Sequence, residues 1–260
     1  MRRIVLTALA LVGLSLASSA SAFVADEYNP NEGPATLTWW DLRVVPRGGD
    51  AVQALGAAQR ADVEYVRGMR PHHAGGVTMS RAYLADPEAR NPSLRALAYA
   101  IIENQTFEVR LLDDVSRLLA EPVRTINFGL FRVAVRPVGT EGLGNQWRFL
   151  RQPIPILTYV GGEVTARDVR FAKAMIVHHE GALRMAGEFN SNPQERNTFL
   201  ALMNVHILTD QTQEITLMRN VIAAYPGNPD AIEVQPGDVQ GMDMPMGGPI
   251  GGSGGGHGQH

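Results

Sequence analysis

The residues of this chain best suited to chemistry are two pairs of adjacent histidines, each flanked by methionines at the same spacing. In chain order the two sets are Met69, His72, His73 and Met79, and Met175, His178, His179 and Met185. Steps of three, four and seven residues fall on one side of an α-helix, so each set presents imidazole nitrogen and thioether sulfur along one arc. Imidazole binds Cu, Zn, Ni and Fe, whereas thioether sulfur is soft and favours Cu(I). The donor chemistry therefore predicts a bound copper ion.

The two sets belong to a longer internal repeat. A shift of 106 residues superposes them without a gap, and it also brings Asp62 onto Asp168 and Gly75 onto Gly181. A period this long exceeds those of solenoid repeats, so we interpret it as the duplication of one supersecondary unit. Further along the chain the same shift pairs Gln105, Thr106 and Glu108 with Gln211, Thr212 and Glu214.

Each copy of the repeat carries two stretches with the period of an amphipathic helix. Apolar residues recur at steps of three and four, and Asn91-Pro92 and Asn192-Pro193 separate the two stretches of each copy. Two helical hairpins, at 62–120 and 167–224, bury their apolar sides most simply as a four-helix bundle, so we expect an all-α fold. Pro71 and two glycines lie inside the first helix, where we expect a kink or a break. The second copy is expected to be the more regular one.

The remaining segments differ in composition. Residues 1–22 have the features of an export signal, namely two arginines, an apolar run and small residues before the cleavage point. The segment 23–61 has no decipherable function. The crossover 121–166 is rich in Pro and Gly and contains a run of Val, Ile and Phe, which predicts a short β-hairpin or an irregular connection. Residues 225–260 are rich in Pro, Gly and Met with no apolar period, which predicts a disordered tail.

Composition limits the class of protein. The 260 residues include no cysteine, so thiolate ligands and disulfides are excluded. The formal net charge is −3, and loss of the signal with Arg2 and Arg3 makes it more negative, which argues against nucleic acid as a partner. The apolar run of the signal is too short to span a bilayer. We therefore expect a periplasmic or extracellular protein with no membrane span after signal cleavage.

Polar residues outside the two sets could support a metal site. Gln105 and Gln211 fall on the apolar sides of their helices, where a polar group needs a partner, and Glu108 and Glu214 lie one turn further along. A carboxylate or amide that faces a histidine on a neighbouring helix fixes the ring tautomer of a metal ligand. The tail adds donors of the same chemistry that could collect soft metal ions, namely Met242, Met244, Met246, His257 and His260.

These motifs resemble those of the DUF305 family, exported proteins with a ferritin-like four-helix fold and the hallmark Met-x-x-His-His-x-x-Ala-x-x-Met. The stretch from Met175 to Met185 matches this hallmark in full, whereas Met69 to Met79 has Gly76 where Ala is expected. Some members are periplasmic copper binders linked to copper tolerance. The resemblance therefore implies a ferritin-like fold and copper handling, with another copper protein of the envelope as a partner.

Two other functions stay open. The chain could be a metal-free structural or interaction module of the cell envelope, in which the histidines are hydrogen-bonded core groups. A ferritin-like metalloenzyme is the third possibility, but a carboxylate-bridged di-metal centre uses Glu-x-x-His on two helices, and no Glu here has a His three residues later. His179-Glu180 does not continue into a His-Glu-x-x-His zinc motif either. We therefore expect a binding protein and not an enzyme.

Overall fold

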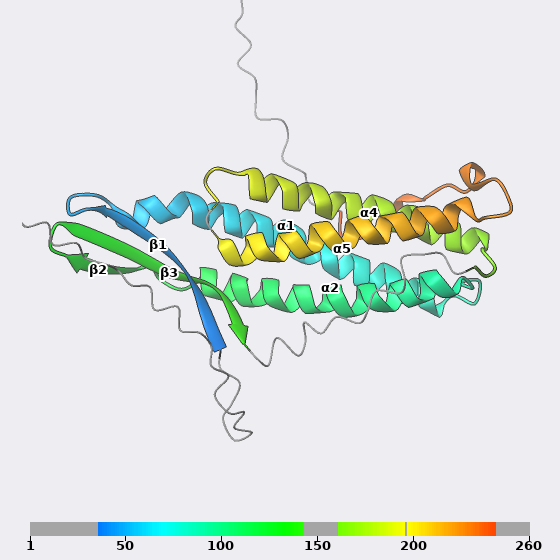
Figure 1. The fold of residues 1–260 in the computed structure, drawn as a ribbon, viewed down its shortest axis with the longest axis horizontal. Coiled ribbons are helices and arrows are strands. Elements are labelled where there is room, and N and C mark those ends of the chain that lie inside the picture. Colours follow the sequence, from blue (N-terminus) through cyan, green and yellow to red (C-terminus); the bar gives the residue numbers. More distant parts are fainter. Residues whose placement is uncertain (1–35, 143–160, 196, 243–260) are drawn as a thin grey trace, which may run out of the picture. The chain divides into compact units, whose positions relative to one another are not determined.

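The computed structural model describes residues 36–142, 161–195 and 197–242, in which four long helices lie beside a small antiparallel sheet (Figure 1). The helices are α1 (Ala51–Ala85), α2 (Pro92–Leu119), α4 (Ala166–Ser191) and α5 (Thr198–Ala223). Helix α1 packs against α2 and α4, while α5 packs against α4 and, over a smaller area, α2. The described chain is thus mostly helical, and its helices form the two predicted hairpins. None of these helices is both long enough and apolar enough to cross a membrane.

Polar residues at corresponding positions begin the second helix of each hairpin. Asn91 caps α2, because its side-chain oxygen accepts the backbone N–H of Leu94 at 3.1 Å. Asn197, which the repeat pairs with Asn91, caps α5 through Leu200 N at the same distance of 3.1 Å. Such caps satisfy N–H groups that have no partner within the helix. The predicted breaks at Asn91-Pro92 and Asn192-Pro193 are both confirmed, since α4 ends at Ser191, although α5 begins after Asn197 and not at Pro193.

Helix α1 is longer and less interrupted than the sequence predicts. It begins at Ala51, inside the segment that we expected to precede the first hairpin, and Asp50 caps it by accepting two backbone N–H groups. The expected break at Pro71 does not occur, since α1 runs through it to Ala85. A proline removes one backbone hydrogen bond. Buried residues on both sides of it, such as Met69 and His73, hold the helix by packing.

The sheet combines two segments that are far apart in the sequence. Strands β2 (Arg124–Phe128) and β3 (Phe131–Gly142) form the hairpin predicted within the crossover. Strand β1 (Thr36–Pro46), which the sequence did not predict, pairs with the other edge of β3, so the strand order is β1-β3-β2. Its pairing is non-local: Leu42 lies opposite Val135.

A buried charge network ties the sheet to the helices. Arg136 of β3 is 2% exposed, and its Nη2 donates to Oδ2 of Asp62 at 2.7 Å and lies 3.5 Å from Oδ2 of Asp41. Nδ2 of Asn197 donates to the same oxygen of Asp62 at 3.3 Å. Burial raises the pKa of Asp62, although the neighbouring Arg136 acts to lower it. The network therefore joins β1, β3, α1 and α5.

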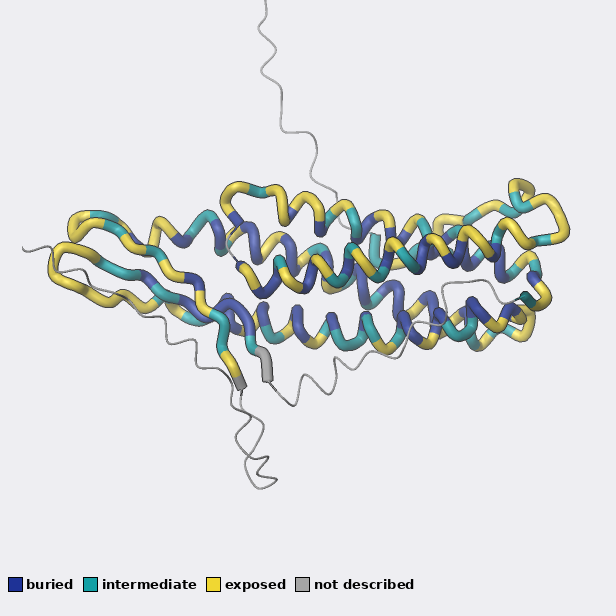
Figure 2. The backbone as a smooth tube through the Cα atoms, in the orientation of Figure 1, coloured by how far each residue is buried: buried dark blue, intermediate teal, exposed yellow. Residues whose placement is uncertain are grey.

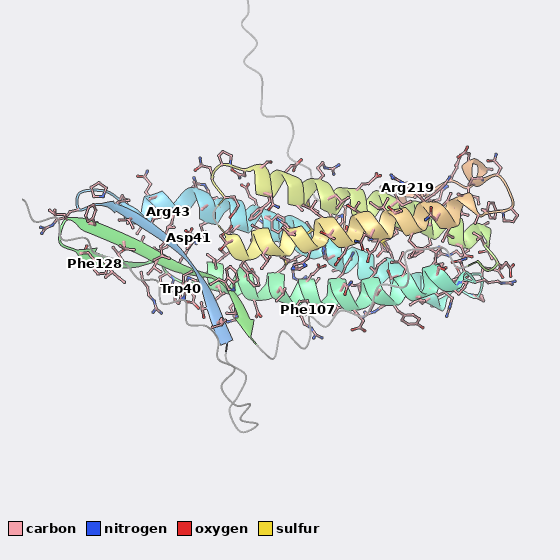
Figure 3. The ribbon with its side chains drawn as sticks, viewed as in Figure 1. Trp40, Asp41, Arg43, Phe107, Phe128 and Arg219 are labelled. Atoms are coloured by element: carbon pink, nitrogen blue, oxygen red, sulfur yellow. The ribbon has the colours of Figure 1, made fainter. Side chains whose placement is uncertain are left out.

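One side of the sheet is apolar and exposed. Trp40 and Phe128, labelled in Figure 3, are 45% and 59% exposed. The neighbouring Trp39 packs instead against Phe199, with ring centroids 6.1 Å apart. The inward sides of the helices are buried (Figure 2). The same face of the sheet also carries Leu42, Val44, Ile126 and Phe131.

The residues that follow α5 correct the prediction of a disordered tail as far as residue 242. They include two short 3-10 helices, at Pro229–Ala231 and Pro236–Asp238. Lys173 of α4 donates to the carbonyl oxygens of Pro229 at 2.7 Å and Ile232 at 3.0 Å. These hydrogen bonds and single apolar side chains hold the segment in place, although its sequence has no helical periodicity. The export signal at 1–22 and residues 243–260 lie outside the described part of the chain.

Candidate metal centre

The four predicted histidines meet in one buried group, which we call the histidine layer: His72, His73, His178 and His179. The ring centroids of His72 and His178 lie 3.8 Å apart across the interface of α1 and α4. Each of these rings lies near the other histidine of its own pair, at 6.0 Å for His73 and 5.9 Å for His179. None of the four is more than 2% exposed. The fold therefore brings both copies of the motif together.

Glu108 of α2 and Glu214 of α5 contact the second histidine of each pair. Nε2 of His179 lies 2.6 Å from Oε2 of Glu214 and is hydrogen-bonded to it. Nε2 of His73 lies 3.0 Å from Oε2 of Glu108, but the direction of this contact is not that of a hydrogen bond. Both carboxylates are buried. The helical spacing thus places each glutamate where it can orient an imidazole.

The first histidines of the two pairs differ. Nε2 of His178 lies 2.8 Å from the backbone oxygen of His72. A carbonyl oxygen only accepts, so this nitrogen carries the proton and Nδ1 carries the free lone pair. Neither ring nitrogen of His72 forms a hydrogen bond of good geometry among the described residues, although the backbone of His178 interacts with the ring and acts to raise its pKa. His72 is therefore the more open of the two equivalent residues.

Buried polar atoms without a hydrogen-bond partner gather at the layer. Leaving such an atom unpaired costs about 1–3 kcal/mol, so a water, ion or ligand that pairs with these atoms would be bound favourably. A methyl group added at Gly76 would overlap Oε1 of Gln105 and lie 2.9 Å from Cε1 of His178, which places the Gln105 amide at the layer. Among the described residues the unpaired atoms include the Nδ1 atoms of all four histidines, Nε2 of His72, both polar atoms of the Gln105 side chain, and Oε1 of Gln211.

Burial keeps three histidines of the layer, His72, His178 and His179, neutral. Desolvation, together with the smaller effect of neighbouring imidazoles, lowers the pKa of His178 and of His179 to about 3. Desolvation also places the pKa of His72 far below its ordinary value. Metal ions bind the neutral imidazole, so no proton has to leave these rings at neutral pH.

The four methionines of the repeat lie in or beside the apolar core. Met69 and Met175 are fully buried in two separate apolar clusters. The sulfur of Met185 faces Gly68 of α1, 3.3 Å from the position that a methyl group there would take. The sulfur of Met79 accepts the backbone N–H of Gln240 at 3.4 Å. These contacts show packing roles, and metal binding by these four sulfurs stays a prediction.

A fifth methionine, Met242, lies at the layer itself. A methyl group added at Gly181 would lie 2.8 Å from Nε2 of His72 and 3.1 Å from Sδ of Met242. We had assigned this methionine to a separate collector in the tail. The glycine that both copies share, Gly75 and Gly181, was the available sign that a further segment approaches here. Met244, Met246, His257 and His260 lie outside the described residues.

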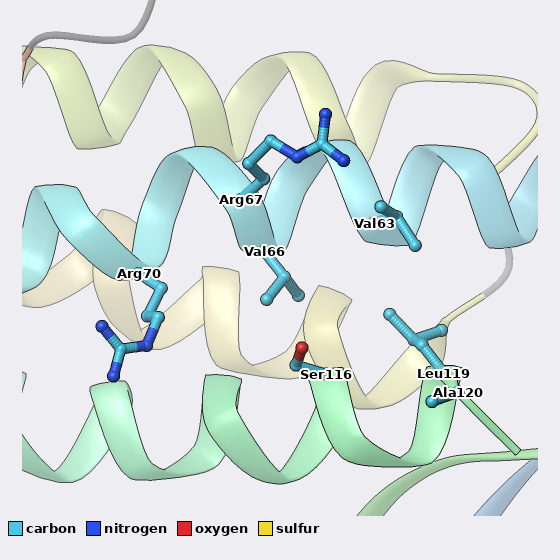
Figure 4. A pocket seen from close by; sticks show the side chains of 7 residues that line it. All are labelled: Val63, Val66, Arg67, Arg70, Ser116, Leu119 and Ala120. Atoms are coloured by element: carbon cyan, nitrogen blue, oxygen red, sulfur yellow. The ribbon is translucent and has the colours of Figure 1, made fainter.

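The carboxylates and imidazoles alone do not make a metal site. Within the described ranges, the histidine layer included, no three His, Asp or Glu side chains form a group that could hold a metal ion. A groove of about 400 Å³ lies on the outer side of the first hairpin (Figure 4). Arg70 at this groove is paired with Asp113. The groove is lined by Val63, Val66, Arg67, Arg70, Ser116, Leu119 and Ala120, and by none of the histidines.

Comparison with protein families agrees with the motifs. The model described as "Domain of unknown function (DUF305)" matches residues 47–116 and 160–248, which together are more than half of the chain. The chain belongs to the DUF305 family. The DUF305 match contains both histidine pairs and continues past the end of α5, so it includes Met242. No curated protein and no solved structure matches the chain.

Proposed function

We propose that this DUF305 protein is an exported copper-binding protein that buffers copper, confers tolerance to it or delivers it to another copper protein of the envelope. The histidine layer carries the proposal. In it, Nε2 of His178 and of His179 is held by an oxygen, while Nδ1 is buried without a partner. Proteins commonly orient a histidine ligand in this way, with one ring nitrogen bound to a carbonyl or carboxylate and the other directed at the metal.

The donor set favours copper over zinc. Imidazole suits both metals, but the thioether of Met242 is a soft ligand that selects Cu(I). The chain has no cysteine that could supply a thiolate to zinc. The pattern of residues 1–22 supports export, and the family resemblance implies that the four helices have the ferritin-like arrangement. In such bundles metal sites are built between facing helices.

A metal-free structural or interaction module is the second candidate. It is favoured by the hydrogen bond from His178 to the backbone of His72 and by the close contact of the two tilted rings, since both join α1 to α4 without a metal ion. In that case the layer stabilises the bundle and selects no metal. A ferritin-like metalloenzyme is less favoured, because the carboxylates of Glu108 and Glu214 already contact imidazoles.

Metal titration separates these functions. The purified protein is titrated with Cu(I), Cu(II), Zn(II) and Fe(II) in competition with chromophoric chelators, beside the double variant His72→Ala/His178→Ala. We expect preferential Cu(I) binding that weakens about 100-fold or more in the double variant, equivalent to about 2.7 kcal/mol. His206→Ala is the matched control, since His206 lies on α5 outside the layer, and it should bind like the wild type.

Circular dichroism checks that the double variant folds, and the more conservative pair His72→Gln/His178→Gln replaces it if it does not. Equal affinity for Cu(I) and Zn(II), with no loss in either double variant, would contradict the copper-binding proposal. Weak binding of every metal, together with a marked loss of stability in the variants, would support the metal-free module.

A further inference from the structure

Residues Gln240–Met242, which we call the crossing segment, run over the first histidine pair. The backbone N–H of Gln240 donates to Sδ of Met79 at 3.4 Å. A methyl group added at Gly241 would lie 2.7 Å from the backbone oxygen of Pro71 and 2.8 Å from Cα of His72. The crossing segment is therefore in direct contact with α1 along the turn that carries His72.

Three glycines make this close approach possible. A methyl group at Gly75 would lie 2.6 Å from the carbonyl carbon of Gln240, so no larger residue fits beneath the segment. Gly241 has a φ of +78°, a conformation that residues with a side chain rarely adopt. Gly181 of α4 leaves room for the side chain of Met242. Gly75 and Gly181 are the glycines that the repeat pairs, so both copies leave space for the same segment.

The crossing segment brings a sulfur to an open nitrogen. His72 is 2% exposed, and neither of its ring nitrogens forms a hydrogen bond of good geometry in the described part of the chain. Nε2 of His72 and Sδ of Met242 both border the same position above Gly181, at 2.8 and 3.1 Å. His178 differs, since its Nε2 already donates to the backbone of His72.

We propose that Nε2 of His72 and Sδ of Met242 form the first Cu(I) site of the protein, with the crossing segment as its cover. The inference rests on the proposed copper-binding function and narrows it to one repeat. Met79 and Gly75 position the segment and bind no metal in this account. One imidazole nitrogen and one thioether sulfur select a soft monovalent cation over Zn(II).

The test is a Cu(I) competition titration of the full chain, combined with copper K-edge X-ray absorption at one equivalent of Cu(I). Met242→Leu removes the sulfur but keeps an apolar side chain of similar volume. We expect at least about tenfold weaker Cu(I) binding, equivalent to about 1.4 kcal/mol, and loss of the sulfur signal. Met203→Leu is the matched control, because Met203 of α5 packs in an apolar cluster and belongs to neither histidine–methionine set, and it should change neither result.

A second variant moves the segment without removing a donor. Gly75→Ala should displace Gln240 and weaken Cu(I) binding to a similar extent, whereas Gly187→Ala, where an added methyl group meets open space, should leave it unchanged. Wild-type affinity and an intact sulfur signal in Met242→Leu would overturn this site. If the double histidine variant nevertheless lost Cu(I) binding, the proposed copper-binding function would still be supported. If the wild type bound no Cu(I), both the site and the copper-binding function would be contradicted.

Discussion

The two copies of the repeat share residue types but differ in what surrounds them. In the second copy, Nε2 of His178 donates a hydrogen bond to the backbone oxygen of His72, which belongs to the first copy. In the first copy, neither ring nitrogen of His72 forms a hydrogen bond of good geometry within the described structure, and the residue lies under residues 240–242. Duplication therefore supplies equivalent side chains, and segments outside the repeat decide which of them can bind a ligand. The copy whose helix contains Pro71 is the one that keeps an open imidazole.

Asp62 and Asp168, which occupy equivalent positions in the two copies, show the same principle. Asp62 is held by a cation from the sheet, through Nη2 of Arg136 at 2.7 Å. Its counterpart Asp168 instead accepts the hydroxyl of Tyr83 at 2.6 Å and the backbone N–H of Asn91 at 3.2 Å. Strand β3 thus supplies a partner for the aspartate of the first copy, whereas residues of the helical hairpins supply the partners of the aspartate in the second copy.

The largest expected effect on stability comes from removing the guanidinium of Arg136, which pairs with Asp62 of the first copy. Arg136→Met leaves Asp62 buried without its positive partner and Asp41 with only the longer contact to Arg43 at 3.8 Å, so the free energy of unfolding should fall by about 3–5 kcal/mol. Urea unfolding measures this value. Arg219, labelled in Figure 3, forms an exposed pair with Glu180, and Arg219→Met should cost no more than about 1 kcal/mol. Equal losses in both variants would contradict the role of the buried network.

Acid should destabilise the metal-free protein through the second copy. Burial lowers the pKa of His178 and His179 to about 3, whereas unfolded histidines take up protons near pH 6.5. Between these values the unfolded state binds more protons, so the free energy of unfolding falls as pH falls, by up to about 2 kcal/mol for each histidine from pH 7 to 5. The other two imidazoles of the layer and the carboxylates of Glu108 and Glu214 face these rings.

The check is urea unfolding at pH 7, 6 and 5 without metal. The slope of stability against pH should be smaller in His178→Ala/His179→Ala than in the wild type. A wild-type protein whose stability is the same at pH 7 and pH 5 would show that these rings are not held neutral.

Two tyrosines of α1 should differ according to the partner of their hydroxyl group. Tyr83→Phe removes a hydrogen bond to a buried carboxylate, that of Asp168, and should cost about 1.5–3 kcal/mol. Tyr65→Phe removes a hydrogen bond to the neutral amide of Asn204 and should cost about 1 kcal/mol. Thermal unfolding of the two variants compares these losses. The reverse order would contradict the account of how Asp168 is held.

The smallest effect on the first site is expected from the rest of the tail. Replacing its four remaining donors should leave the affinity for the first equivalent of Cu(I) within about twofold, because that site lies at His72 and Met242. The number of weakly bound ions should fall. A loss of first-site affinity would instead place the site in the tail. The changes are Met244→Leu, Met246→Leu, His257→Ala and His260→Ala.

The sequence predicted the features that depend on local patterns of residues, but not those that depend on contacts between distant segments. Helical periodicity identified the two hairpins, and the one-turn offset from Gln211 to Glu214 indicated which residues could face a histidine on the neighbouring helix. The hairpin in the crossover was visible from its β-branched residues. Strand β1 was missed because it is stabilised by pairing with β3, about 90 residues away. The position of Met242 was missed because a Gly- and Pro-rich segment has no period, although it is held by contacts with α1 and α4.

The most direct test of the central claim is the ¹⁵N spectrum of the histidine rings, recorded before and after one equivalent of Cu(I). The account predicts that the ring signals of His72 move first, while the Nε2 signal of His179 keeps the signature of its hydrogen bond to Glu214. Cu(I) that binds stoichiometrically without moving the His72 signals would contradict it.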